Sequence, residues 1–122
     1  MQGPTSDVGT ELLFENDTVR VWSMELAPGQ ESQYHRHLLD YLIVYVTPSR
    51  ITRMDRPGDS GVTEEFADGW VKYLNVGAGV QHLIRNDRDS THRQIIVELK
   101  LPMDSRAATT DNGRMIKTSA LT

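Results

Sequence analysis

The chain has 122 residues, of which 38% are hydrophobic and 25% charged, enough apolar material for one modest core and too much for a disordered chain. Its 17 acidic residues outnumber its 13 basic ones, and the net charge of −4 argues against a nucleic-acid partner, because phosphate binding needs a concentrated positive face. Cysteine is absent, which excludes disulfides and thiolate chemistry, so any metal ion must be held by histidine, carboxylate, tyrosine or backbone oxygen.

Neither a membrane span nor a signal peptide is visible in the sequence. No apolar run approaches the roughly 20 residues that cross a bilayer. Residues 1–9 are polar and lack a basic region followed by an apolar stretch. We therefore expect no membrane partner and a cytoplasmic location.

Short β-rich runs separated by turn residues follow one another along the chain. The predicted strands are, in order, Glu11–Phe14, Val19–Leu26, Ser32–His37, Tyr41–Val46, Arg50–Asp55, Val62–Phe66, Trp70–Leu74, Val80–Asn86 and Gln94–Lys100. The breakers between them contain glycine, proline, asparagine and aspartate, which favour turns. Short strands at this spacing, without a long stretch of helical periodicity, predict an all-β fold, an antiparallel sandwich or barrel.

The pattern within two of these strands predicts their environment. Trp22, Met24 and Leu26 alternate with more polar residues, so we expect all three to face the core. The nearly unbroken apolar run Tyr41–Val46 is typical of a central strand that is covered on both faces.

Two of the four histidines are placed for metal binding. His35 and His37 are two residues apart on a predicted strand, so both imidazoles project from the same face, a few ångströms apart. A divalent cation between them would use both rings. The alternative is a surface face on which two histidines happen to alternate.

The residues around these histidines resemble the two sequence motifs of the cupin superfamily. In the first motif a glycine is followed after five residues by His-x-His, and the second ends in Gly-x-x-His-x-x-x-Asn. Two sets of residues match at the expected spacing: Gly29, His35 and His37 in the first motif, and Gly79, His82 and Asn86 in the second. The resemblance covers roughly residues 11–100 and implies a double-stranded β-helix, the jelly-roll barrel of the cupins.

The resemblance also implies a metal site formed by His35, His37 and His82. One divalent ion is expected, with Fe(II) favoured and Zn, Ni, Mn or Cu possible, since imidazole suits them all. The glutamate of the first motif should fall at position 41 or 42, where this sequence has Tyr41 and Leu42. Three neutral ligands leave the full charge on the metal, which favours a small anionic molecule.

Several further residues are candidates around this site. Tyr41 has the strand parity of the missing glutamate, so we predict that it is a catalytic residue. It could act as a weak metal ligand, as a hydrogen-bond donor to the substrate or as an acid. The alternative is a core tyrosine that only packs. Asp40 has the opposite parity and would be a ligand only at a bulge; otherwise it lies at the surface or orients a histidine. The residues expected to contact substrate are Gln33, Tyr45 and Arg85. We expect His92 to be an exposed loop histidine.

The expected organisation is an N-terminal segment (1–10), a barrel domain (11–100) and a C-terminal tail (101–122). The tail is rich in Ser, Thr, Ala and Asp, which indicates loose order. Alternatively, Met115 and Ile116 dock an extra strand or turn onto the body or onto a second subunit. Because a small barrel has exposed edges to cover, we also expect a homodimer.

Three classes of function remain open on the sequence alone. The first is a metal-dependent enzyme, dioxygenase-like or a lyase or isomerase of a small acid. The second is a ligand-binding or sensor protein without turnover. The third is a storage or structural protein whose histidines are remnants, and the intact histidine triad argues against it. A small barrel favours a small-molecule ligand in every case.

Overall fold

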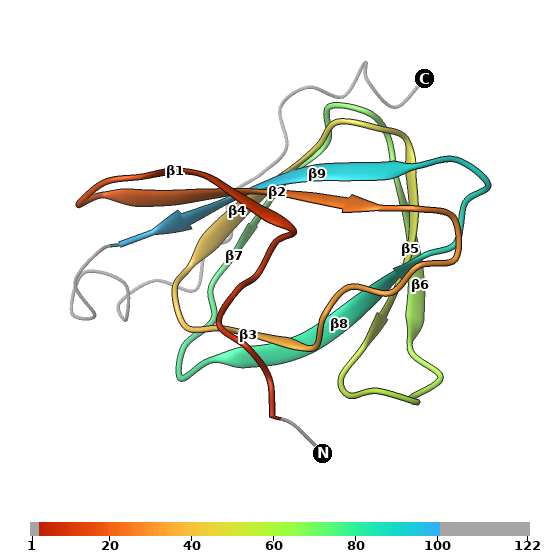
Figure 1. The fold of residues 1–122 in the computed structure, drawn as a ribbon, viewed down its shortest axis with the longest axis horizontal. Helices are drawn as coiled ribbons and strands as arrows, with labels where there is room; N and C mark the ends of the chain where they lie inside the picture. Colours follow the sequence, from red (N-terminus) through yellow and green to blue (C-terminus); the bar gives the residue numbers. More distant parts are fainter. Residues whose placement is uncertain (1–2, 101–122) are drawn as a thin grey trace.

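The computed structural model describes residues 3–100, which form two antiparallel sheets packed face to face (Figure 1). The strands are β1 (Glu11–Glu15), β2 (Val19–Leu26), β3 (His35–His37), β4 (Tyr41–Tyr45), β5 (Ser49–Met54), β6 (Val62–Phe66), β7 (Val71–Leu74), β8 (Val80–Asn86) and β9 (His92–Leu99). One sheet has the order β1-β2-β9-β4-β7 and the other the order β3-β8-β5-β6. Among residues 3–100 there is no helix that could cross a membrane.

The all-β prediction is confirmed, and every predicted strand is present. Three of them, β2, β6 and β8, have the predicted bounds. The largest differences are at β3, which begins at His35 instead of Ser32, and at β9, which begins at His92 instead of Gln94. The tail, with Met115 and Ile116, lies outside the described residues, and the domain bounds stay a prediction.

The core lies between the two sheets and follows the period-two alternation of the strands. Trp22, Met24 and Leu26 of β2 are buried there, as predicted. Strand β4 lies between β9 and β7, so its central position is confirmed as well. Its outward-facing residues Leu42 and Val44 are only half-buried, so among the described residues its outer face is only partly covered.

Two glycines of the predicted motifs shape the turns that precede the histidine strands. Gly29 (φ 79°) and Gly79 (φ 125°) both adopt positive φ, which side-chain-bearing residues rarely do. The N–H of Gly29 donates to the carbonyl of Asn86, 2.8 Å away. A Cβ atom at Gly79 would lie 3.1 Å from Nε of Arg36. Both positions therefore require glycine because of their backbone conformation, and Gly79 also because of close packing.

Asn86, the last residue of the second motif, ties neighbouring loops together. Its side-chain Nδ2 donates to the carbonyls of Leu26 and Ser90, at 3.0 and 2.8 Å, and its Oδ1 accepts from the N–H of Arg88 at 3.0 Å. The side chain is fully buried, and these bonds satisfy its polar atoms. Its role is structural: it fixes the loops at the end of β8.

Candidate metal centre

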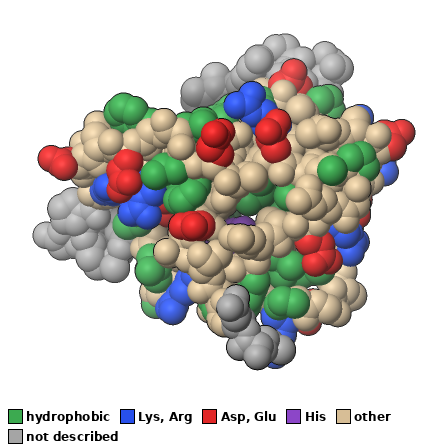
Figure 2. Space-filling view, viewed as in Figure 1, with side chains coloured by type: hydrophobic (Ala, Val, Ile, Leu, Met, Phe, Trp, Pro, Cys, Tyr) green, Lys and Arg blue, Asp and Glu red, His purple; other side chains and the backbone are tan. Residues whose placement is uncertain are grey.

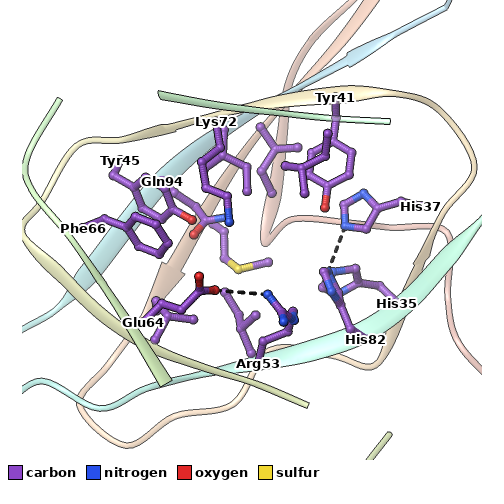
Figure 3. Close-up of a pocket in the computed structure, with 16 residues that line it drawn as sticks. His35, His37, Tyr41, Tyr45, Arg53, Glu64, Phe66, Lys72, His82 and Gln94 are labelled. Carbon is purple, nitrogen blue, oxygen red and sulfur yellow. Dashed lines mark hydrogen bonds and ion pairs between the residues drawn. The ribbon is translucent and has the colours of Figure 1, made fainter. Parts of the chain in front are cut away.

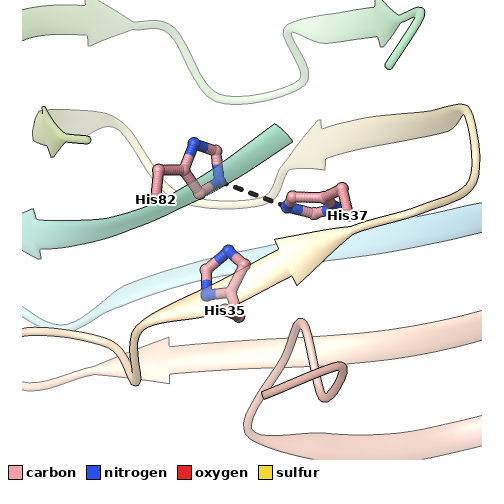
Figure 4. A group of neighbouring side chains, drawn as sticks. All are labelled: His35, His37 and His82. Carbon is pink, nitrogen blue, oxygen red and sulfur yellow. Dashed lines mark hydrogen bonds between the residues drawn. The ribbon is translucent and has the colours of Figure 1, made fainter. Parts of the chain in front are cut away.

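Strand pairing brings the three histidines of the predicted metal site together. β3 pairs with β8 so that His35 lies directly opposite His82, and His37 lies two residues along β3, opposite Val80. Alternation therefore puts all three imidazoles on the inner face of the sheet, where they are buried. Figure 4 shows them facing one another from the two strands.

The three rings surround a common point. Their centroids are 4.8, 4.9 and 5.0 Å apart, and each pair is arranged edge to face. One ring nitrogen of each lies within 4.8 Å of the others, and Nε2 of His37 is 3.2 Å from Nε2 of His82. This convergence is the arrangement that a small cation shared by three imidazoles requires.

The hydrogen bond of His35 favours a free lone pair at this point, whereas Nε2 of His37 and Nε2 of His82 share a hydrogen bond whose proton a bound cation would displace. Nδ1–H of His35 donates to the carbonyl of Gln33 at 2.8 Å, which leaves Nε2 as the unprotonated nitrogen. Nδ1 of His37 and Nδ1 of His82 are buried and have no hydrogen-bond partner among the described residues. Unpaired buried polar atoms are unusual in folded proteins, and they commonly mark a functional site or an unplaced ion. The donor set therefore fits a divalent metal ion.

Burial keeps the three imidazoles neutral. It lowers the pKa of His37 to about 2 and that of His82 to about 3, and in each case the neighbouring His35 lowers the pKa further. Burial also lowers the pKa of His35, although its bond to Gln33 acts in the opposite direction. Only neutral imidazole can donate a lone pair, so the site is ready to coordinate across the physiological pH range.

The triad lies at the inner end of a cavity of about 50 Å³ between the two sheets. Apolar side chains from both sheets line it, such as Ile43 of β4 on one sheet and Ile84 of β8 on the other. Figure 3 shows Glu64 and Lys72 away from the grouped histidines, with Arg53 between Glu64 and the histidines. The cavity thus has a neutral end and a charged mouth.

Tyr41 lies beside the triad, where its strand parity predicts it. Its ring stacks on His37 with centroids 3.9 Å apart and planes 10° apart. Figure 3 shows its hydroxyl pointing into the cavity. Burial raises the pKa of this hydroxyl, so it stays protonated and can donate. A catalytic role for Tyr41 remains a prediction.

Of the three predicted substrate contacts, only Tyr45 lines this cavity. Its ring stacks on that of Phe66, with the two centroids 4.3 Å apart. Arg85 points to the other face of β8 because its parity differs from that of His82, and its Nε pairs with Oδ1 of Asp87 at 2.6 Å. Gln33 lies before the start of β3, so strand alternation does not apply to it, and its side chain is exposed. The structure therefore corrects the placement of Arg85 and Gln33.

Gln33 lines a separate and larger groove, of about 300 Å³, on the other side of His35. Figure 2 shows a histidine side chain at the bottom of a hollow near the middle of one face of the molecule. His35 is the one member of the triad that lines this groove, and its Nδ1 is already bonded to Gln33. The larger groove is therefore not the point where the three nitrogens converge.

The structure also corrects the expectations for Asp40 and His92. Asp40 is buried, and its Oδ1 accepts a hydrogen bond from the N–H of Val76 at 2.9 Å, so it fixes the loop before β8 and is neither a surface residue nor a partner of the histidines. His92 is fully buried instead of exposed, because β9 begins two residues earlier than predicted. Its Nδ1 forms a hydrogen bond with Oγ of Ser49 at 2.9 Å, and its Nε2 forms one with Oε1 of Gln94 at 2.7 Å.

Reasoning from the sequence missed the polar residues at the mouth of the cavity: Arg53, Glu64, Lys72 and Gln94. Strand parity was the available signal. Arg53 has the parity of the core residue Ile51, and Gln94 that of Ile96, so each projects inward with an apolar neighbour. An isolated charge on a strand is usually read as solvent-facing, which hides this signal.

Comparison with solved structures gives close matches in fold. The chain is 27% identical to a cupin domain protein from Bordetella pertussis Tohama I, with a TM-score of 0.65 over 83% of this chain and 99% of that one. It also matches an RmlC-like cupin with a double-stranded β-helix fold from Methanocaldococcus jannaschii (16% identity, TM-score 0.57, 84% and 90% of the two chains). A third match is a polyketide cyclase from Streptomyces resistomycificus, with 19% identity and a TM-score of 0.55 over 83% of this chain and 71% of that one. No protein-family model and no curated protein matches the sequence.

Proposed function

This chain is a small member of the cupin superfamily, and from that premise we propose that it binds one divalent metal ion through His35, His37 and His82 and acts on a small anionic organic molecule in dioxygenase-like chemistry. The observation that carries this proposal is the convergence of three buried, neutral imidazoles at the inner end of a cavity. Fe(II) is the first metal to test, followed by Zn, Ni, Mn and Cu.

The ligand set explains the preference for an anion. No carboxylate belongs to the histidine group, so a bound ion would keep its full positive charge and act as a Lewis acid toward an oxygen-bearing ligand. The hydroxyl of Tyr41 can donate a hydrogen bond to such a ligand. Apolar side chains such as Ile43 and Ile96 limit the water around it and thereby strengthen both interactions.

One observation favours a second candidate, a ligand-binding or sensor protein without turnover. Glu64 is the one carboxylate among the described residues that line the cavity, and it is paired with Arg53 at 3.1 Å. Lyase or isomerase chemistry usually requires a free general base. The cavity therefore supports binding more directly than it supports proton abstraction.

Elemental analysis tests the metal site. Protein grown in medium supplemented with each metal should contain about one ion per chain, and His37→Ala should remove most of it while the protein stays folded. His92→Gln is the matched control, since it changes a buried histidine that is not in the triad and should leave the metal content unchanged.

Oxygen uptake by the metal-loaded protein with a panel of small carboxylic acids then separates the two candidates. Turnover supports the enzyme, whereas saturable binding without oxygen consumption supports the sensor. A wild-type protein that contains no metal and binds none on titration would contradict the proposal as a whole.

A further inference from the structure

Three charged side chains meet at the mouth of the histidine cavity, and each comes from a different strand. Arg53 of β5 lies opposite Ile84, two residues along β8 from His82. Glu64 of β6 lies opposite Ile51, and Lys72 of β7 lies across the cavity on the other sheet. Figure 3 shows Arg53 between Glu64 and the histidines, with the amine of Lys72 pointing into the cavity from the opposite side.

The charges at the mouth are unbalanced. Nη1 of Arg53 is 3.1 Å from Oε1 of Glu64, which is the one carboxylate among the described cavity-lining residues. Lys72 forms no ion pair with the described residues, and its Nζ lies over the ring of Phe66, 4.9 Å from the centroid. The mouth therefore holds two cations and one anion, with the neutral histidines behind them.

The pair between Arg53 and Glu64 is suited to exchange. Their side chains are 40% and 41% exposed, and such partly exposed ion pairs contribute little to stability. An entering carboxylate can take the place of Glu64 on the guanidinium at small cost and can accept a second hydrogen bond from Lys72. Glu64 then acts as a competitor that weakens anion binding.

The size of the cavity limits the ligand. A volume of about 50 Å³ has room for roughly four water molecules. A molecule that spans the distance from the charged mouth to the triad must therefore be slender and must carry a polar group at each end.

We propose that Arg53 and Lys72 form a carboxylate-binding subsite that selects a short carboxylic acid, of about two to four carbon atoms, whose second oxygen-bearing group reaches the histidines. The subsite deepens the proposed function, and its link to the histidines rests on that function. Its contacts with the carboxylate involve only side chains of this chain. They can be measured with and without metal.

A second ion pair on the same two strands supplies the matched control. Arg50 of β5 lies opposite Glu65 of β6, and Nη2 of Arg50 is 3.2 Å from Oε1 of Glu65. These side chains are 49% and 67% exposed, and neither lines the cavity. Substitutions at this pair change the same charges without touching the proposed subsite.

The experiment measures binding of pyruvate, glycolate and oxalate, with the neutral analogue acetamide, by calorimetry on metal-loaded and EDTA-treated protein. We expect Arg53→Gln and Lys72→Met each to weaken carboxylate binding about tenfold, the usual effect of losing one charge-assisted hydrogen bond. Glu64→Gln should tighten it, because the competing anion is lost. Arg50→Gln and Glu65→Gln should change nothing, and acetamide should bind equally to all variants.

Two results would overturn the subsite: wild-type protein that binds none of the three carboxylates, or carboxylate affinity that is the same in wild type and in the Arg53→Gln/Lys72→Met double variant. The metal content of every sample separates this failure from failure of the metal site. If the wild type proves metal-free, the proposed function fails, but Arg53-dependent carboxylate binding in the EDTA-treated protein still supports the subsite. If metal is present and the affinities do not change, only the subsite fails.

Discussion

The inner end of the cavity and its mouth differ in how firmly their side chains are held. At the inner end, His35 and His37 are almost completely buried, and a hydrogen bond to the Gln33 carbonyl fixes the protonated nitrogen of His35. At the mouth, Arg53 and Glu64 are two-fifths exposed and can exchange partners with solvent or a ligand. The buried end is therefore suited to hold an ion in one geometry, and the mouth is suited to select what approaches it.

The largest expected effect concerns metal affinity at the inner end. His82→Ala removes one of three imidazoles, and we expect at least about a 100-fold loss of affinity, since even residues that only orient a ligand are worth 10–100-fold. Lys72→Met, at the mouth, should change metal affinity less than about threefold, because it contacts no ligand atom. Competition titration with a chromophoric chelator measures both. Equal losses in the two variants would remove the distinction between the two ends.

Tyr41 sharpens the comparison because it lies where the buried end meets the open cavity. Tyr41→Phe keeps the ring that stacks on His37, so we expect the metal to be retained. Loss of the hydroxyl donor should weaken binding of a small carboxylate by about 1–3 kcal/mol. Metal content and ligand affinity are the two measurements.

Tyr41→Glu is the converse variant. It places a carboxylate near the triad, so it should tighten metal binding and weaken anion binding through like charge. Loss of metal in Tyr41→Phe would show that the phenol is itself a ligand. If neither variant differs from wild type, Tyr41 only packs.

The strands and the pair of His35 and His37 could be predicted because both depend on local spacing, whereas His82 was predicted from the resemblance to the cupin motifs. His35 and His37 share a face in any strand, and the glycine turns and Asn86 mark where the neighbouring strands begin and end. Short-range geometry predicted two of the three histidines at the inner end of the cavity, and the motif resemblance supplied the third.

The mouth of the cavity depends on pairing between distant strands, which spacing alone does not specify. Arg53, Glu64 and Lys72 meet only because β5, β6 and β7 close around one cavity from two sheets. His92 was misjudged for a related reason. It follows a polar turn, and only its pairing with Leu26 across β2 and β9 directs its ring inward.

A smaller effect is expected from His92, a buried histidine outside the triad. Burial lowers the pKa of His92 below its ordinary value of 6.5. The unfolded chain therefore binds a proton that the folded chain does not. The stability that depends on neutral His92 is therefore fully present above pH 6.5. As the pH falls below 6.5, the free energy of unfolding decreases by up to about 1.4 kcal/mol per pH unit.

His92→Gln should reduce this dependence on pH. Urea unfolding of EDTA-treated wild type and variant at pH 7.5, 6.0 and 5.0 measures it, and the difference in the free energy of unfolding between the two should shrink or reverse toward pH 5.0. A constant difference across the three pH values would show that His92 is protonated in the folded state or is not buried.

The smallest expected effect is the contribution of the ion pair at the mouth to folding. A double-mutant cycle of Arg53→Gln and Glu64→Gln should give a coupling in the free energy of unfolding below about 1 kcal/mol, because both side chains are partly exposed and screened. The pair formed by Arg50 and Glu65 should give a similar value. The two pairs then differ only in ligand binding, which responds to Arg53 and Glu64 and not to Arg50 and Glu65. A coupling of several kcal/mol at the mouth would mean that Glu64 holds Arg53 too firmly to exchange for a substrate carboxylate, and the contrast between a fixed inner end and an exchangeable mouth would no longer hold.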